Sequence, residues 1–197
     1  MSKLWTSLFP LLYTRHVLKK KTIVLGVCGG IAAYKSADII RRLVEAHADV
    51  YVMMTKSAQE FITPLTLQTL SGHPVYTDLF SLTQEQEIGH ISLADRADLI
   101  VIAPASADTL AKVAHGICDD LLTTVLCATR APVLFAPSMN VHMWENSITR
   151  ENVQKLERHG FHFIEPDSGF LACGYTGKGR LPDAEMIVKE IGKILKK

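Results

Sequence analysis

The sequence predicts an α/β fold: a doubly wound parallel sheet, Rossmann-like or flavodoxin-like, with helices on both faces. Two observations predict it. Apolar runs rich in β-branched residues alternate along the chain with segments of helical period, as in parallel strands joined by crossover helices. Most of these runs are apolar almost throughout, which is typical of strands covered on both faces.

Each element follows from a run of this kind. The expected strands are, in chain order, residues 22–28, 49–55, 98–104, 132–138 and 161–166. Between the first two, Ile39, Ile40, Leu43 and Val44 are spaced as one apolar stripe of a helix. Further helices are expected over 57–71, interrupted near Pro64, and over 106–116, 119–129, 146–159 and 183–195.

One segment, 166–183, fits neither period and contains four glycines, at positions 169, 174, 177 and 179. We expect it to be a long irregular loop. Loops of that length inside a compact domain are usually functional or disordered.

Length and composition favour one folded unit. The 197 residues are 48% apolar, enough for a single substantial core, so we expect residues 1–20 to be an N-terminal extension and 21–197 a single domain. With 21 basic and 20 acidic residues, the net charge of +1 gives no general attraction to nucleic acid or to an anionic membrane. No apolar run reaches the roughly 20 residues that span a bilayer.

The first residues and the cysteines bear on the compartment. The N-terminal segment is apolar and basic, but its basic run follows the apolar part, whereas a secretory signal has its charge first. We interpret it as an extension, with a targeting role as the alternative.

The cysteines, at positions 28, 118, 127 and 173, form no C-x-x-C pair. Reduced thiols in a cytoplasmic protein without a metal site are the simplest interpretation.

Ligands of open parallel sheets bind at the carboxyl ends of the strands. The first strand ends at Gly29 and Gly30, followed by Ile31, which is not the dinucleotide fingerprint G-x-G-x-x-G. Thr55 and Ser57 follow the second strand, where NAD-binding folds place an acidic residue. These hydroxyls and the ammonium of Lys56 suit a phosphate better than a ribose, so a mononucleotide is favoured over a dinucleotide. The alternative is that Ser57 only caps the next helix.

Two further strand ends complete the expected cleft. Ser106, Asp108 and Thr109 follow the third strand at a helix start, where Ser106 could also be an ordinary N-cap. Met139 and Asn140 follow the fourth strand, placing a soft apolar group beside a neutral amide. Together these ends suit a flat polar ring with a phosphate tail, against which Met139 could pack.

Five segments carry a family resemblance: GVCGGIAAYKSADIIRRL, MTKSAQEFITPLTLQTLSG, GHISLADRADLIVIAPASADTLAKVAHGICDDLLTTVLCAT, APSMNVHMW and ACGYTGKGRL. They resemble the FMN-dependent cysteine decarboxylases, and within them the phosphopantothenoylcysteine decarboxylases of coenzyme A biosynthesis. The similarity covers about residues 21 to 190. Many bacterial relatives continue into a ligase domain, so the resemblance is to the stand-alone form.

The resemblance implies FMN as cofactor and a homo-oligomer, either a trimer or a dodecamer built from trimers. Many relatives have asparagine where this chain has Asp108. The implied cofactor-binding residues are Gly29, Gly30, Ile31, Thr55, Ser57, Phe61, Ala105, Ser106, Asp108, Thr109 and Met139.

The implied reaction is decarboxylation of phosphopantothenoylcysteine to phosphopantetheine after transient oxidation of the substrate thiol. By resemblance His90 is the acid/base group, Asn140 binds the substrate carboxylate and Cys173 donates the last proton, with Ala172 and Gly174 also at the substrate. Taken alone, such residues are more often a solvated or capping histidine, an asparagine in a left-handed turn and an inert thiol.

Other functions remain open from the sequence. A peptidyl-cysteine decarboxylase stops at the enethiol and needs no returning hydride, so the Ala-Cys-Gly setting of Cys173 disfavours it. A non-catalytic flavin-binding regulatory protein is disfavoured because His90, Asn140 and Cys173 are all present. A prenyl-transferring flavoprotein shares the fold but has different strand ends. Lys178 and Arg180 either attract the substrate phosphate or are solvated charges.

Overall fold

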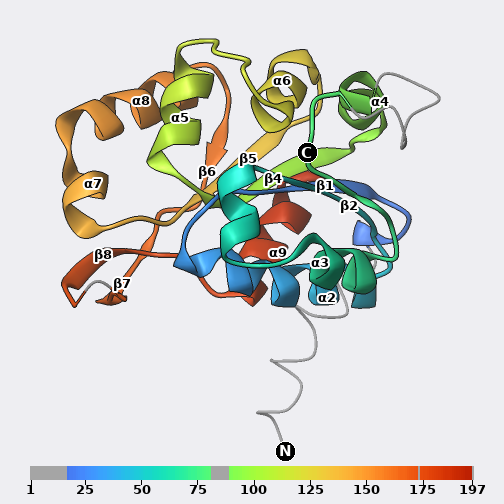
Figure 1. Ribbon diagram of the computed structural model, residues 1–197, viewed down its shortest axis with the longest axis horizontal. Coiled ribbons are helices and arrows are strands. Elements are labelled where there is room, and N and C mark those ends of the chain that lie inside the picture. Colours follow the sequence, from blue (N-terminus) through green and yellow to red (C-terminus); the bar gives the residue numbers. More distant parts are fainter. Residues whose placement is uncertain (1–16, 81–88, 173, 197) are drawn as a thin grey trace, which may run out of the picture.

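The computed structural model describes residues 17–80, 89–172 and 174–196. Six strands form one sheet in the order β3-β2-β1-β4-β5-β6, and every adjacent pair is parallel (Figure 1). The predicted fold class is therefore confirmed. The strands are β1 (Thr22–Val27), β2 (Asp49–Met54), β3 (Val75–Tyr76), β4 (Leu99–Ala105), β5 (Val133–Pro137) and β6 (His162–Phe163).

All five predicted strands are present. The apolar runs of β1, β2, β4 and β5 are largely buried between the two helix layers, whereas β6 is a short, half-buried edge strand. In β1, Ile23 and Leu25 belong to one hydrophobic cluster and Val24 to the other. Each such side chain is fully buried, which stabilises the fold by roughly 1.5–3 kcal/mol. The sequence did not predict β3, because its two residues are not part of a longer apolar run.

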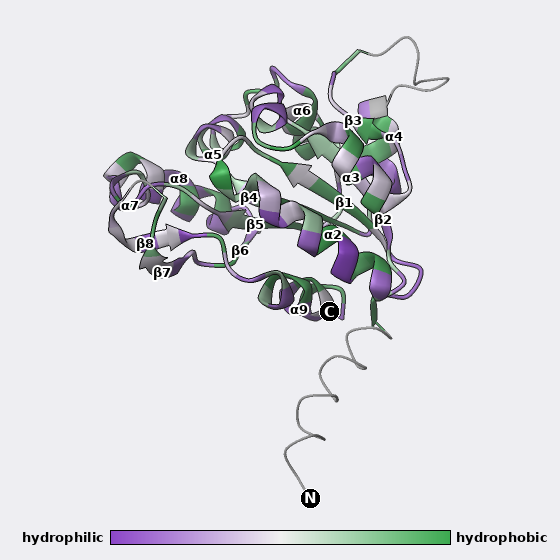
Figure 2. Cartoon of the chain, turned by 60° about the horizontal axis from the view of Figure 1, so that its bottom comes forward, coloured by the Kyte–Doolittle hydropathy of each residue, from purple (hydrophilic) through white to green (hydrophobic). Residues whose placement is uncertain are grey.

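Helices cover both faces and make three layers (Figure 1). In Figure 2 the green, apolar residues of the helices lie largely toward the sheet. One face packs against α2 (Ser36–Glu45), α3 (Pro64–Ser71) and α9 (Ala184–Ile194). The other packs against α4 (Gly89–Arg96), α5 (Ala107–Ala114), α6 (Leu121–Ala128) and α8 (Ser147–Arg158).

The helix starts follow local capping chemistry. The predicted helix over 57–71 is two elements, the 3-10 helix η2 (Lys56–Glu60) and α3, because Thr63 caps a new helix with Pro64 in its first turn. In α2 the expected stripe is narrower than predicted. Ile39, Ile40 and Leu43 are buried, whereas Val44 is 39% exposed.

The expectation of an irregular loop over 166–183 was wrong. The segment contains an antiparallel hairpin of β7 (Asp167–Phe170) and β8 (Thr176–Arg180). The Gly179 carbonyl accepts hydrogen bonds from the Met139 backbone N–H, at 3.0 Å, and from the Ser138 hydroxyl, at 3.2 Å. The hairpin was missed because β7 and β8 are held by backbone contacts and carry little apolar alternation.

The chain before β1 contributes to the core. Leu18 is fully buried in the cluster under α2 and α9, and the Lys20 N–H donates to the His47 carbonyl at 2.9 Å. Residues 1–16 lie outside the described residues, so the division between extension and domain stays a prediction. Among the residues that the structure describes, no helix combines the length and apolar composition needed to cross a bilayer.

Candidate functional site

A cavity of about 690 Å³ lies between the carboxyl ends of β1, β4 and β5 and the β7–β8 hairpin. Its volume is within the usual range for small-molecule sites. The sheet side contributes Gly29, Gly30, Ser106, Ser138 and Met139, and the hairpin side contributes Phe170, Leu171, Ala172, Gly179 and Arg180. The described lining holds two cations, Lys35 and Arg180, and no carboxylate. It therefore favours an anionic ligand.

The glycine pair after β1 leads into a short 3-10 helix, η1 (Ile31–Lys35). A Cβ at Gly29 would lie 2.5 Å from the Ser57 Cβ and 2.8 Å from the Ser57 carbonyl carbon, so only glycine lets η2 pack there. A Cβ at Gly30 would meet nothing within 4 Å. Gly29, Gly30 and Ile31 all line the cavity.

The second strand end lies behind this turn rather than in the cavity wall. Thr55, not Ser57, caps the following helix: its hydroxyl oxygen accepts from the Ala58 N–H at 3.2 Å. Ser57 packs against Gly29, and Phe61 is 48% exposed beyond η2. None of Thr55, Ser57 and Phe61 lines the cavity.

At the third strand end, Ser106 is both an N-cap and a cavity residue. Its oxygen accepts from the Thr109 N–H at 3.2 Å, and its hydroxyl donates to the Thr109 Oγ1 at 3.1 Å. Thr109 Oγ1 also lies 3.2 Å from the Cys28 Sγ, so Thr109 faces the interior, where Ala105 is also buried. Burial raises the pKa of the Cys28 thiol above its usual value.

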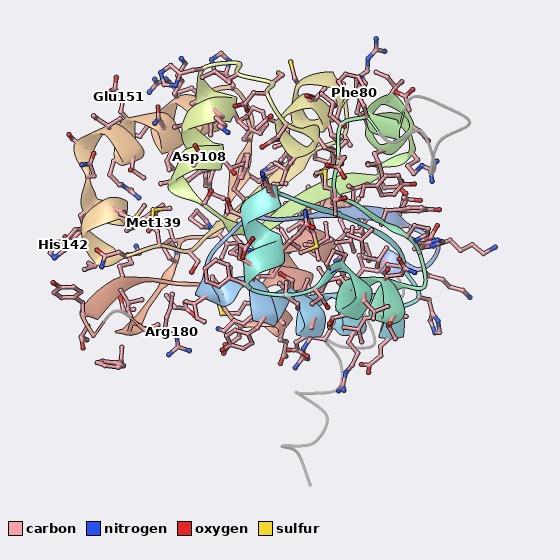
Figure 3. The ribbon with its side chains drawn as sticks, in the orientation of Figure 1. Phe80, Asp108, Met139, His142, Glu151 and Arg180 are labelled. Carbon is pink, nitrogen blue, oxygen red and sulfur yellow. The ribbon has the colours of Figure 1, made fainter. Side chains whose placement is uncertain are left out.

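Asp108 does not reach the cavity. Its side chain is exposed on the first turn of α5 and pairs with the Lys112 ammonium at 3.4 Å (Figure 3). Lys112 also pairs with Asp119 at 3.2 Å, and this hydrogen bond with Asp119 is the main reason that the pKa of Lys112 is raised. The Asp108 carboxylate is thus paired with Lys112 on the protein surface and does not face the cavity.

Met139 and Asn140 do line the cavity, from the turn between β5 and α7 (Val141–Glu145). Asn140 has φ −57°, so the left-handed turn considered from the sequence is wrong. It caps α7 instead: Oδ1 accepts from the His142 N–H at 2.8 Å. This bond identifies Oδ1 as the acceptor and the amide nitrogen as the donor of the side chain.

The remaining predicted residues are not all assembled in one chain. His90 is half-buried on α4, which lies at the opposite end of the molecule from the hairpin in both Figure 1 and Figure 2. Its buried Nδ1 has no hydrogen-bond partner among the described residues. Cys173 lies outside the described residues. Its neighbour Ala172 lines the cavity, whereas Gly174, with φ 86°, does not.

Several cavity residues were not predicted. Tyr34 and Lys35 come from η1, Phe170 is the last residue of β7, and Leu171 directly follows it. The first two were findable, because they lie one helical turn beyond the glycine pair. The other two lie in a segment for which the sequence predicts an irregular loop, and that prediction does not single them out.

These residues fit a flat ring with an anionic tail. Backbone at the glycine pair leaves room for a close approach, and Ile31 and Met139 supply apolar surface. Ser106 and Ser138 add hydroxyls, and the described lining presents no carboxylate that would repel a phosphate. The chemistry of the lining is therefore that of a nucleotide-type cofactor site.

Comparison with known proteins places the chain in a family. The model of the Flavoprotein family matches residues 12–196. The coenzyme A biosynthesis bifunctional protein CoaBC of Bacillus subtilis is 51% identical over 173 residues, which is 88% of this chain but 43% of that protein. A probable phosphopantothenoylcysteine decarboxylase of Streptococcus mutans is 47% identical over 173 residues, which is 87% of this chain and 97% of that protein.

Solved structures agree with this placement. A PPC decarboxylase mutant complexed with pantothenoylaminoethenethiol has a TM-score of 0.82 and 32% identity, covering 91% of this chain and 100% of that chain. The FMN-dependent cysteine decarboxylase SpaF has a TM-score of 0.79 and 28% identity, covering 92% and 99%. The chain spans less than half the length of the CoaBC relative, but it covers a whole structural unit of these flavoproteins. The chain belongs to the Flavoprotein family.

Proposed function

We propose that the protein is a carboxy-lyase that uses FMN to decarboxylate phosphopantothenoylcysteine to phosphopantetheine in coenzyme A biosynthesis. The observation that carries the proposal is the cavity, which joins the glycine turn at 29–30 to the Met139–Asn140 turn without a carboxylate in its described lining. The names of the Streptococcus mutans relative and of the matching PPC decarboxylase structure support the substrate.

FMN would be held at the sheet side of the cavity. Gly29, Gly30 and Ser106 would face its polar groups, and Ile31 and Met139 would pack on its ring. The chemistry supplied by bound FMN is reversible two-electron oxidation of the substrate thiol, which places a C=S bond β to the carboxylate. The protein's part is to position the substrate and to move protons.

Asn140 is the proposed carboxylate-binding residue. Its amide nitrogen donates a hydrogen bond without adding a full positive charge. A strong ion pair would stabilise the ground-state carboxylate, which has to become neutral CO2. The cap to the His142 N–H fixes the orientation of the amide for this purpose.

His90 is the proposed acid/base group, and it has to come from another copy of the chain. Its helix, α4, lies at the opposite end of the molecule from α7 and the β7–β8 hairpin in Figures 1 and 2, so we expect another copy of the chain to bring His90 to Asn140. Large apolar side chains around the cavity support an assembly: Ile31 is 61% exposed, Tyr34 59% and Phe170 70%. Such patches usually mark interfaces. We infer a homotrimer or a dodecamer of trimers.

Cys173 is the proposed proton donor to the enethiolate after CO2 has left, with Ala172 and Gly174 beside it. It lies outside the described residues, so its support is its sequence setting and the position of Ala172 in the cavity wall. Cys28, Cys118 and Cys127 are free thiols, which supports the cytoplasm as the compartment.

An absorption spectrum and a CO2 assay test the proposal. Purified protein should show flavin bands, and anaerobic addition of phosphopantothenoylcysteine should release CO2 and form phosphopantetheine. Asn140→Asp keeps the size but places a negative charge beside the substrate carboxylate, so we expect turnover to fall by at least about 100-fold. A colourless protein that cannot be reconstituted with FMN would refute the proposal.

Product analysis separates this function from that of a peptidyl-cysteine decarboxylase. With Cys173→Ser, we expect CO2 release to continue while the oxidised enethiol accumulates, because the proton for the last step is missing. The control is the unchanged enzyme, which should give the saturated thiol only. If the variant also gives the saturated thiol at the unchanged rate, Cys173 has no such role.

A further inference from the structure

We propose that Arg180 binds the phosphate of the substrate and thereby sets a preference for phosphorylated over unphosphorylated pantothenoyl compounds. The inference deepens the proposed function and rests on it for the identity of the substrate. The ligand group is a phosphomonoester dianion, and the site is the hairpin side of the cavity.

The hairpin directs its two cations to different places. In the β7–β8 ladder Ser168 pairs with Lys178 and Asp167 pairs with Arg180, so Gly179 is an extra residue in β8. Such a bulge resets the alternation of side chains, and residues 178 and 180 therefore lie on opposite faces of the hairpin. Arg180 lines the cavity, whereas Lys178 lines a separate pocket with Arg150 and Glu165.

The other cations near the cavity are already engaged. Lys178 forms an ion pair with Glu165 outside the cavity. Lys35 donates to the Leu181 carbonyl at 3.0 Å and lies 3.7 Å from the Asp183 carboxylate. Among the described residues, the side chain of Arg180 forms no hydrogen bond or ion pair, while its backbone pairs with Asp167 in the strand ladder. Its guanidinium remains available for a ligand.

The backbone beneath Arg180 leaves room for its side chain. A Cβ at Gly169 would lie 3.1 Å from both the Cδ and the Nη1 of Arg180, so the side chain runs closely over this glycine. Figure 3 shows Arg180 beside the hairpin and Met139 on the turn after β5, at the same end of the molecule. The arginine and the proposed flavin contact thus belong to one cavity.

A phosphate fits Arg180 better than the reacting carboxylate does. Arg180 is exposed at the cavity rim, whereas the reacting end of the substrate has to be enclosed with the flavin. A dianion that stays partly in water has less desolvation to overcome, and the planar guanidinium binds two phosphate oxygens at once. An ion pair to the carboxylate would instead oppose CO2 loss.

The test compares ligands that differ only in the phosphate. Binding of phosphopantetheine and of pantetheine to FMN-loaded protein is measured by calorimetry, and kcat/KM is measured for phosphopantothenoylcysteine and pantothenoylcysteine. The unchanged protein should prefer each phosphorylated compound. Arg180→Met should reduce that preference about 10-fold, which is the size of one charge-assisted hydrogen bond. Arg180→Lys should restore part of it, because a single charge remains.

Lys178→Met is the matched control. It removes a cation from the same strand two residues away, and it should leave the phosphate preference unchanged. The proposal is overturned if Arg180→Met weakens phosphorylated and unphosphorylated ligands equally, or if Lys178→Met changes the preference as much as Arg180→Met does. It is also overturned if the unchanged protein has no preference.

The two proposals fail separately. If phosphopantetheine binds better than pantetheine and Arg180→Met abolishes the difference, the phosphate site stands even when no CO2 is released, and only the proposed reaction is wrong. If CO2 is released but the variant keeps its full phosphate preference, the reaction stands and the phosphate site is wrong.

Discussion

Ser106 contributes both to the fold and to the wall of the cavity. The Ser106 oxygen caps α5, its hydroxyl donates to Thr109, and Thr109 in turn contacts the Cys28 thiol. The alternatives weighed from the sequence, cap or ligand contact, are therefore compatible at this position. The cap orients Ser106 at the cavity wall, and the chain of contacts anchors that wall to β1.

Cys28 should be chemically inert in the folded protein. It is 1% exposed, and burial raises the pKa of its thiol, so little thiolate forms and reagents cannot reach it. We expect Cys118 and Cys127, which are exposed, to react first with iodoacetamide at pH 8. Peptide mapping by mass spectrometry measures this. Labelling of Cys28 as fast as in urea would contradict the structure.

The sequence correctly predicted cavity residues that directly follow the carboxyl end of a parallel strand. Gly29, Gly30, Ser106, Met139 and Asn140 all reached the cavity, because parallel strands bring their carboxyl ends to one edge. The sequence did not predict cavity residues correctly where the direction of the side chain determines whether it faces the cavity. The local sequence does not show that Thr109 turns inward, and the four-residue spacing of Asp108 and Lys112, which permits an ion pair, does not decide between that pair and a ligand contact.

At the scale of elements, the close packing of η2 on the end of β1 makes the glycine turn sensitive to one methyl group. Gly29→Ala would place its Cβ 2.5 Å from the Ser57 Cβ, and backbone would have to move. We expect a loss of roughly 1–3 kcal/mol, or a fall in Tm of roughly 2–12 °C. Thermal unfolding followed by circular dichroism measures it.

Gly30→Ala is the matched control for this substitution. It adds the same methyl group one residue later, where nothing lies within 4 Å and the backbone is extended. We expect its Tm to stay within about 2 °C of the unchanged protein, since small surface changes rarely exceed 0.5 kcal/mol. Equal losses for both variants would show that the contact with Ser57 does not matter.

The hairpin is held to the α7–α8 region by a charge cluster. Glu165 pairs with Lys178 and, at 3.5 Å, with Arg150, whose guanidinium lies 4.5 Å from the Trp144 ring centre. The hydrogen bond from Lys178 holds the pKa of Glu165 below its ordinary value. No apolar period marks such an element, so the sequence could not predict the hairpin.

This cluster predicts a pH dependence. A carboxyl group whose pKa is lowered by folding stabilises the folded state above its unfolded pKa, near 4.5, and loses that effect as the pH falls through the lower folded value. Glu165→Gln should therefore be less stable than the unchanged protein at pH 7 and about equal to it at pH 3. Urea unfolding at both pH values measures this.

The size of that effect should be modest, because the Glu165 side chain is 52% exposed and the pair is screened by salt. Glu45→Gln, which removes an exposed pair with Arg41, is the control and should change little at either pH. A stability difference for Glu165→Gln that is the same at pH 3 and pH 7 would rule out the ionic contribution.

At the scale of the whole molecule, the separation of His90 from the cavity is the main feature that the sequence could not show. The parallel, doubly wound sheet was predictable, because apolar runs and segments of helical period alternate along the chain, but the order of its strands was not predicted. The distance between α4 and the hairpin depends on the three-dimensional path of the chain. The helix of the predicted acid/base residue and the hairpin of the cavity thus lie apart in one chain.

Subunit mixing tests whether the site is shared. His90→Asn and Asn140→Asp should each be inactive, and co-refolding them should restore activity, because some sites then receive His90 and Asn140 from different copies. Random mixing in a closed ring gives a maximum of about one quarter of the unchanged activity. Each variant refolded alone is the control. No recovery in assembled mixed oligomers would mean that each site belongs to one subunit.

The buried side chain of Leu18 limits how the N-terminus can be processed. If a peptidase removed a leader from this chain, the mature protein would have to begin before Leu18, since a cut at residue 20 would empty a space filled in the core. Loss of such a leucine typically costs roughly 2–5 kcal/mol. A cleaved targeting segment is therefore compatible with the fold only if the cleavage site precedes Leu18.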